Sequence, residues 1–360
     1  FRSGIVAGVS SGIALIMEIP GGYIADKIGH KQALVLGAFF LTISPLFYVL
    51  MPSFIGITLA SGFFFFGYSF HSGTLQAFMH ETLIELDMEN KFSKIQARGN
   101  MWGLIGNIFL VALVPITYSI NPKIPFIIGS LLISVVFFYS LTLTNPSQVK
   151  TKVEDMGIFD IKNLIKSLKR NNNYILFILL GIVASVYDKV PIFREIYFQA
   201  LDIPVVYFGT ILALSSLVGI IFSLFIEKLS KLPATTFYFL DAIFSVILVI
   251  LIGLSTNAIL GVALFTILAA YDRNRDAVVH NFVLADCPTR ALKATYLSLL
   301  AFIANVFGMF LPIMLGYYIG KYGIFSGHYY YGIIMGMLVL LLYLWYFFKR
   351  KPLVNYGIKS

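Results

Sequence analysis

Acids and histidines lie inside long apolar stretches of this sequence, where a side chain that binds or releases a proton is unusual. Glu18 and Asp241 are carboxylates in two such stretches, and His71, His80 and Glu81 belong to a third. An ionised group near the centre of a bilayer costs about 2.5–3.5 kcal/mol on insertion scales, and such groups usually face a cavity or a partner. Because carboxylates and imidazoles exchange protons, these five residues are candidates for proton coupling.

Each candidate also has a structural interpretation. Glu18 could instead hold helices together through an ion pair or hydrogen bond, for example with Arg98. Asp241 could have a packing role or lie at the lipid interface, and the histidines could be hydrogen-bonded groups between packed helices. The sequence leaves these alternatives open.

A second polar group, "YDRNRD" at residues 271–276, alternates acids and arginines. Arg273 and Asp276, like Asp272 and Arg275, are three residues apart, a spacing that places two side chains on one helix face. The group is therefore either an internally paired structural network or a gate that contacts an anionic group.

Other polar residues in apolar stretches are candidates for lining a cavity or gate. Besides Arg273, Arg275 and Asp276, they are Gln76, Arg98, Asn107, Tyr187, Asp188 and Asn305. Tyr187 and Asp188 are expected near the outer end of their helix, at an extracellular mouth.

The composition shows what must position these side chains. The chain is 59% hydrophobic and 12% charged, with a mean hydropathy of +0.87, whereas soluble domains are roughly 45–50% apolar and 25% charged. Apolar stretches of about 20 residues are long enough to cross a bilayer as helices. Eleven spans are expected, at residues 4–25, 31–52, 54–80, 97–118, 122–143, 173–192, 205–226, 235–254, 257–280, 292–316 and 328–348.

The basic residues predict the orientation, because cytoplasmic loops collect lysine and arginine. With the 26–31 turn inside, 21 of the 26 basic residues, including those of the C-terminal tail, fall on the cytoplasmic side. The net charge of +9 therefore reflects topology and does not indicate nucleic-acid binding. Cys287 is the only cysteine, which excludes an intrachain disulfide and a thiol metal cluster.

An internal repeat explains the odd number of spans. "GYIADKI" at 22–28 matches "SLFIEKL" at 223–229, "AFMH" at 77–80 matches "AVVH" at 277–280, and Asn107 matches Asn305, at offsets of 201, 200 and 198 residues. The polar parts of the third and ninth spans are then equivalent and are expected to line one cavity. The partner of the 173–192 span would precede Phe1, so we expect a six-plus-six bundle that lacks its first helix, with Phe1 at the outer surface.

Four regions follow from this repeat. They are an N-terminal bundle at 1–144, a cytoplasmic linker with an amphipathic helix at 145–172, a six-helix bundle at 173–348 and a basic cytoplasmic tail at 349–360.

The sequence resembles the major facilitator superfamily (MFS) of transporters. "GYIADKIGHK" is similar to that superfamily's loop signature between its second and third helices, and "EIPGGYIAD" resembles bacterial efflux-type permeases. The resemblance implies an all-α fold of two pseudo-symmetric bundles, here helices two to twelve. It also implies a cytoplasmic gating latch, whose residues would be Gly22, Asp26, Lys27, Gly29 and Lys31, with a degenerate copy at Glu227 and Lys228.

The resemblance implies secondary transport of small molecules by alternating access, with proton-coupled efflux of amphipathic compounds as the first expectation. A facilitator or proton symporter importing a small polar solute is the alternative, and a non-transporting sensor is a third. The chain lacks the enzyme motifs His-Glu-x-x-His and Gly-x-Ser-x-Gly and a phosphate loop. We expect no enzyme activity, no metal or other cofactor beyond the proton gradient, no nucleic-acid partner, and a monomer in a bacterial cell membrane. The helix-four arginine of many antiporters is absent from residues 54–79, which weakens the case for antiport.

Overall fold

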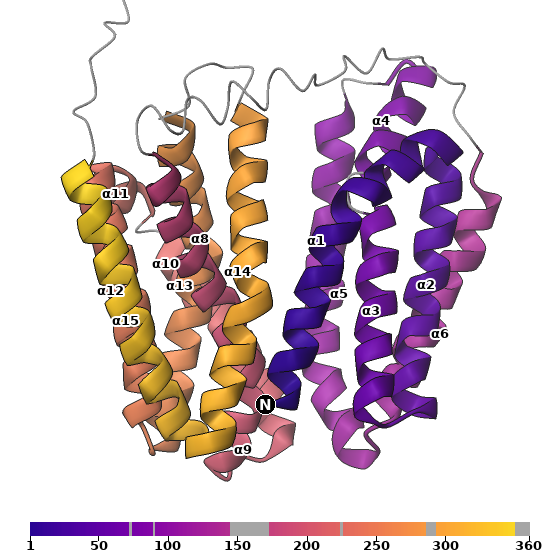
Figure 1. Cartoon of the computed structure of the whole chain (residues 1–360). Helices are drawn as coiled ribbons and strands as arrows, with labels where there is room; N and C mark the ends of the chain where they lie inside the picture. The colour runs from indigo at the N-terminus through magenta and orange to yellow at the C-terminus, as the bar shows by residue number, and fades with distance from the viewer. Residues whose placement is uncertain (72–73, 89–90, 145–172, 224–225, 286–292, 350–360) are drawn as a thin grey trace, which may run out of the picture.

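The computed structural model is all helical in the parts of the chain that it describes, residues 1–71, 74–88, 91–144, 173–223, 226–285 and 293–349. One group of helices comprises α1 (Arg2–Ile28), α2 (His30–Leu50), α3 (Phe54–His71), α4 (Thr74–Glu85), α5 (Phe92–Ile120) and α6 (Ile124–Thr142). The other comprises α8 (Asn173–Lys189), α9 (Arg194–Ala200), α10 (Phe208–Ser223), α11 (Ile226–Ser230), α12 (Ala234–Leu254), α13 (Ala258–Ala285), α14 (Lys293–Tyr322) and α15 (Ile324–Lys349), with 3₁₀ turns η2 (Val190–Phe193) and η3 (Val205–Tyr207). Figure 1 shows the two bundles side by side.

The expected spans coincide with helices. In the described residues, eight helices are long and apolar enough to cross a membrane. The predicted end of one span at 192 is wrong, because α8 is continued by η2 and α9 into an apolar unit that reaches Ala200. Pro191 lies in the first turn of η2, where its missing N–H breaks no helical hydrogen bond. The amphipathic helix expected at 145–172 lies outside the described residues.

The two bundles touch through two related contacts at one end of the molecule. A Cβ added at Gly8 of α1 would lie 2.4 Å from the carbonyl oxygen of Met309 in α14, and one at Gly209 of α10 would lie 2.3 Å from the carbonyl oxygen of Val111 in α5. The repeat makes α1 the counterpart of α10 and α5 the counterpart of α14. The two contacts are therefore the same contact made twice, as a pseudo-twofold axis requires.

Within the described part of the chain, one face of α5 lacks the cover that its counterpart α14 has. In the second bundle, α8 packs on α14 so closely that a Cβ at Gly181 would lie 2.7 Å from Ile303, and Ser185 Oγ donates a hydrogen bond to the Ala304 carbonyl at 2.6 Å. On α5, an added Cβ at Gly103 or Gly106 would meet no described atom within 4 Å. An additional N-terminal span would have room here, and that span remains a prediction.

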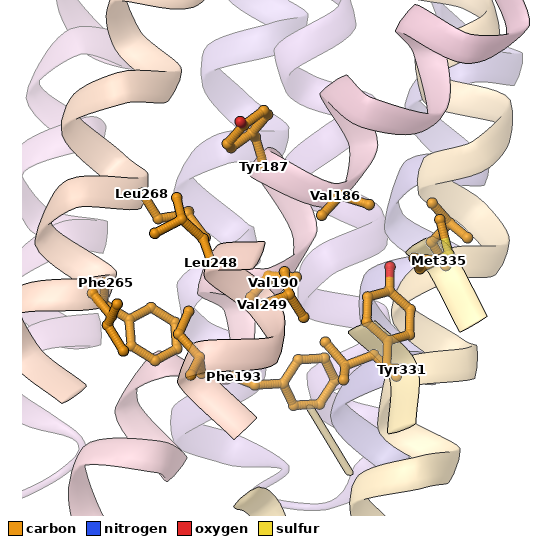
Figure 2. Packing of buried hydrophobic residues seen from close by; sticks show 14 of the residues in the cluster. Val186, Tyr187, Val190, Phe193, Leu248, Val249, Phe265, Leu268, Tyr331 and Met335 are labelled. Atoms are coloured by element: carbon orange, nitrogen blue, oxygen red, sulfur yellow. The ribbon is translucent and has the colours of Figure 1, made fainter. Parts of the chain in front are cut away.

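The second bundle has an apolar core that surrounds α8. Figure 2 shows Val186, Val190 and Phe193 packed among side chains of α12, α13 and α15, such as Leu248 and Tyr331. Tyr187 lies at one end of this cluster (Figure 2). The core thus holds α8 rigidly at the point where its polar residues begin.

Phe1 and Lys349, the last residue of α15, lie at opposite ends of the molecule (Figure 1). This arrangement agrees with an outer position for Phe1 if the basic side is cytoplasmic.

Candidate functional site

A fully enclosed ion pair joins two helices of the second bundle. Arg275 of α13 donates from Nε to both carboxylate oxygens of Asp241 in α12, at 2.9 and 2.8 Å. Both side chains are 1% exposed. The guanidinium Nη2 is buried with no hydrogen-bond partner in the described part of the chain.

Two tyrosines complete the surroundings of this pair. The Tyr271 hydroxyl donates to the Asp241 carboxylate at 3.1 Å, and the Tyr187 hydroxyl donates to the Asp241 backbone carbonyl at 3.3 Å. The Arg275 guanidinium carbon lies 5.4 Å from the centre of the Tyr187 ring, within cation–π range. Asp241 is thus a packed, hydrogen-bonded group, and its position at a lipid interface is excluded by burial.

The pairing expected within residues 271–276 is largely wrong. Arg275 takes Asp241 as its main partner and only a longer contact of 3.4 Å to Asp276. Arg273 donates to Ser216 of α10 at 2.9 Å, and Asn274 donates to the Gly219 carbonyl at 2.9 Å. Spacing along one helix cannot reveal partners on a neighbouring helix. Here the shorter contacts of Arg273, Asn274 and Arg275 are with residues of α10 and α12.

Three further acids lie beside this ion pair. Asp188 of α8 and Asp276 of α13 have side chains that are 67% and 62% exposed, and Asp188 forms an ion pair with Lys189 at 2.6 Å. Asp272 is half-buried and interacts electrostatically with both of these acids. No hydrogen bond or ion pair reaches the Asp272 carboxylate from the described residues. We call Asp188, Asp272 and Asp276 the acidic cluster.

Tyr187 and Asp188 are among the last residues of α8, but the apolar segment does not end with this helix. Because α8 is continued to Ala200, both residues lie near the middle of the unit Tyr174–Ala200. Tyr187 is fully enclosed in the bundle, whereas Asp188 is exposed beside it.

A cavity of about 580 Å³ with both polar and apolar walls lies between the bundles, next to Lys189. Its other walls come mainly from α1 and α3, and its polar lining consists of Arg2, Ser3, Ser10, Ser11, Ser53, Ser61 and Lys189. A Cβ added at Gly308 of α14 would lie 3.6 Å from both Lys189 Nζ and Ser11 Oγ. Lys189 therefore reaches from the acidic cluster towards the first bundle.

The titratable residues of the first bundle are dispersed. His71 packs against α2, since a Cβ at Gly37 would lie 2.6 Å from its ring, and its Nε2 is buried without a partner among the described residues. Glu81 is hydrogen-bonded to His30 Nδ1 at 2.8 Å, which connects α4 to the start of α2. His80 is half-buried in α4. Sequence reasoning did not identify His30, although it stands inside the "GYIADKIGHK" signature.

The structure describes only some of the residues proposed for the latch and the cavity. Gly29 has a φ of +98° in the turn between α1 and α2, a conformation that favours glycine. Lys27, Lys228, Arg98 and Asn107 are exposed; Lys31 and Asn305 are half-buried. The side chains of Glu18, Asp26, Gln76 and Glu227, and the surroundings of Gly22, lie outside the described structure. The latch therefore remains a prediction.

Comparison with known proteins gives structural likeness only. No family model matches the sequence, and no curated protein does. A mutant form of the nucleoside transporter NupG superposes with a TM-score of 0.78 and 18% identity, over 97% of this chain and 91% of that one.

Two further solved transporters share the architecture. A bacterial homologue of the human lysosomal transporter Spinster, inward-facing and unoccupied, has a TM-score of 0.68 and 13% identity over 97% of this chain and 88% of that one. A POT family transporter in complex with 5-aminolevulinic acid has a TM-score of 0.65 and 14% identity over 98% and 89%. With its two helical bundles and the contact made twice between them, the chain has the major facilitator superfamily fold of membrane transporters.

Proposed function

We propose that this protein is a proton-coupled membrane transporter of small molecules that works by alternating access. The acidic cluster, whose Asp188 is paired with the cavity-lining Lys189, is the observation that carries the proposal. Its neighbourhood holds four carboxylates, counting Asp241, against the two cations Arg275 and Lys189. Excess negative charge within a membrane protein is costly unless a proton or a cationic group neutralises it.

The contacts between the bundles are consistent with a rocking motion. Gly4 packs closely on α14 near Phe1, and α1 and α14 diverge from there towards the opposite end of the molecule (Figure 1). The bundles therefore meet tightly towards one end. Alternating access in folds with repeated halves is largely rigid-body rocking of one half against the other around a fixed site.

We infer export of amphipathic compounds as the direction, because "EIPGGYIAD" resembles efflux-type permeases. Import of a small polar solute is a second candidate, favoured by the serine-rich lining of the cavity. The likeness to a nucleoside transporter and to a POT family transporter in complex with 5-aminolevulinic acid supports this second candidate.

Flux measurements in proteoliposomes test the proposal. We expect an imposed proton gradient to drive movement of either the amphipathic cation ethidium or the nucleoside uridine, and the compound that moves selects between the two candidates. Reversing the gradient should reverse the movement. Equal flux in protein-free vesicles, for these and a wider panel of solutes, would refute transport, whereas flux that ignores the gradient would refute proton coupling alone.

A further inference from the structure

We propose that Asp272 is the carboxylate that takes up the coupling proton, and that the unpaired Nη2 of Arg275 is its partner when it is ionised. This inference rests on the proposed transport function and assigns the proton site within it. The step is a simple protonation, in which the Asp272 carboxylate and one proton from the cavity give a neutral carboxylic acid.

Asp272 differs from its neighbours because no described residue forms an ion pair with it. Asp241 is held by Arg275 at 2.8 Å, and Asp188 is held by Lys189 at 2.6 Å. Asp276 has a weaker contact with Arg275 at 3.4 Å and is 62% exposed, so water also solvates it. Among the described acids of this region, Asp272 is thus the one without a cationic partner, so that protonation is what neutralises it.

The surroundings of Asp272 oppose its ionised form from several elements. Asp276 on its own helix, Asp188 on α8 and Asp241 on α12 all repel the ionised carboxylate, and Arg275 alone attracts it. A like charge nearby and partial burial both favour the neutral acid. Because Asp272 is only half-buried, a proton can still reach it.

Arg275 supplies the second, independent observation. Its side chain is 1% exposed, with Nε bound to Asp241 and Nη1 in contact with Asp276, yet Nη2 has no partner among the described residues. Leaving a buried charged donor without a partner is costly. Since Asp272 lies three residues before Arg275, one turn of α13 brings its ionised carboxylate within reach of this donor.

Protonation of Asp272 would therefore switch α13 from one arrangement of its charged side chains to another. The ionised Asp272 would be drawn to Arg275, and the neutral acid would be released from it. Such a local change in pairing can bias a two-state rocking motion, because each state then has a different affinity for the proton.

Infrared spectroscopy of the reconstituted protein tests the site with protons alone. In a titration from alkaline to acidic buffer, we expect the wild type to show a carboxylic-acid stretching band that Asp272→Asn loses. Asp202→Asn is the matched control, because Asp202 is exposed outside the bundles and its φ of 57° also suits asparagine. A band that persists in Asp272→Asn, or that is lost instead in Asp276→Asn, would overturn the assignment.

A flux assay separates this inference from the proposed function. With ethidium or uridine, whichever the wild type moves, Asp272→Asn should keep gradient-independent exchange and lose gradient-driven accumulation. Accumulation equal to the wild type would refute the role of Asp272 in coupling. Absence of all flux from the wild type, with the infrared band still assigned to Asp272, would instead refute transport and leave the proton site standing.

Discussion

Arg275 and Asp241 show what a buried charge needs in this protein. Each is enclosed almost completely, and the pair is supplemented by the Tyr271 hydroxyl. Taking two ions out of water costs several kcal/mol each, and only good geometry with additional hydrogen bonds offsets that cost. The pair therefore fixes α13 against α12 and, through the ring of Tyr187, against α8.

Removing one partner of this pair should destabilise the fold strongly. We expect Arg275→Met to cost about 3–5 kcal/mol, because it leaves the Asp241 charge buried and alone. The double variant Arg275→Met with Asp241→Leu should recover most of that loss, since apolar replacements of similar size are tolerated at buried pairs. Thermal unfolding in detergent measures both, and a double variant no more stable than the single one would contradict this account.

At the scale of elements, glycine and the carbonyls of proline-containing helices build the contacts between the bundles. Pro115 and Pro312 both lie inside their helices, α5 and α14. A Cβ at Gly209 would lie 3.2 Å from Pro115 as well as close to Val111. Small residues let two helix backbones approach closely, which is how helices associate in membranes.

Gly4→Ala should therefore open the outer end of the molecule, because its Cβ would lie 2.2 Å from a Pro312 carbonyl oxygen. We expect faster labelling of a cysteine at Ser11, in a Cys287→Ser background, by a maleimide that does not cross membranes. Ser11 suits this test because it lines the cavity and is 5% exposed. Gly129→Ala in α6 is the control, since its Cβ would meet no described atom within 4 Å. Equal labelling in both variants would show that the contact between Gly4 and α14 does not close the cavity.

For the whole molecule, the distribution of basic residues predicts which end faces the cytoplasm. The end with Phe1 also carries the turn between α12 and α13, which contains the exposed Thr256. The opposite end carries the last residue of α15, Lys349, ahead of the basic tail.

Labelling of whole cells tests this topology. A cysteine at Thr256, in a Cys287→Ser background, should react with the impermeant maleimide in intact cells, because the predicted orientation places it outside. The native Cys287 should react only after the membrane is permeabilised. If Cys287 reacted in intact cells and the cysteine at residue 256 only after permeabilisation, the orientation would be the opposite one. The loop between α1 and α2 would then lie on the outer side.

The sequence by itself determined the helices, their order and the expected sidedness. Spans of about 20 apolar residues have few other stable forms in lipid, where the backbone must satisfy its own hydrogen bonds. The repeat also predicted that α5 and α14 are counterparts, and both carry an internal proline at the contact between the bundles.

Only the tertiary structure decided which charges meet. Arg275 is paired with a residue 34 positions away, and Glu81 with one 51 positions away, so neither pairing can be read from spacing along one helix. The distance between two side chains depends on how neighbouring helices rotate and pack. For the same reason, the uncompensated charge of Asp272 emerged only when α8, α12 and α13 were placed together.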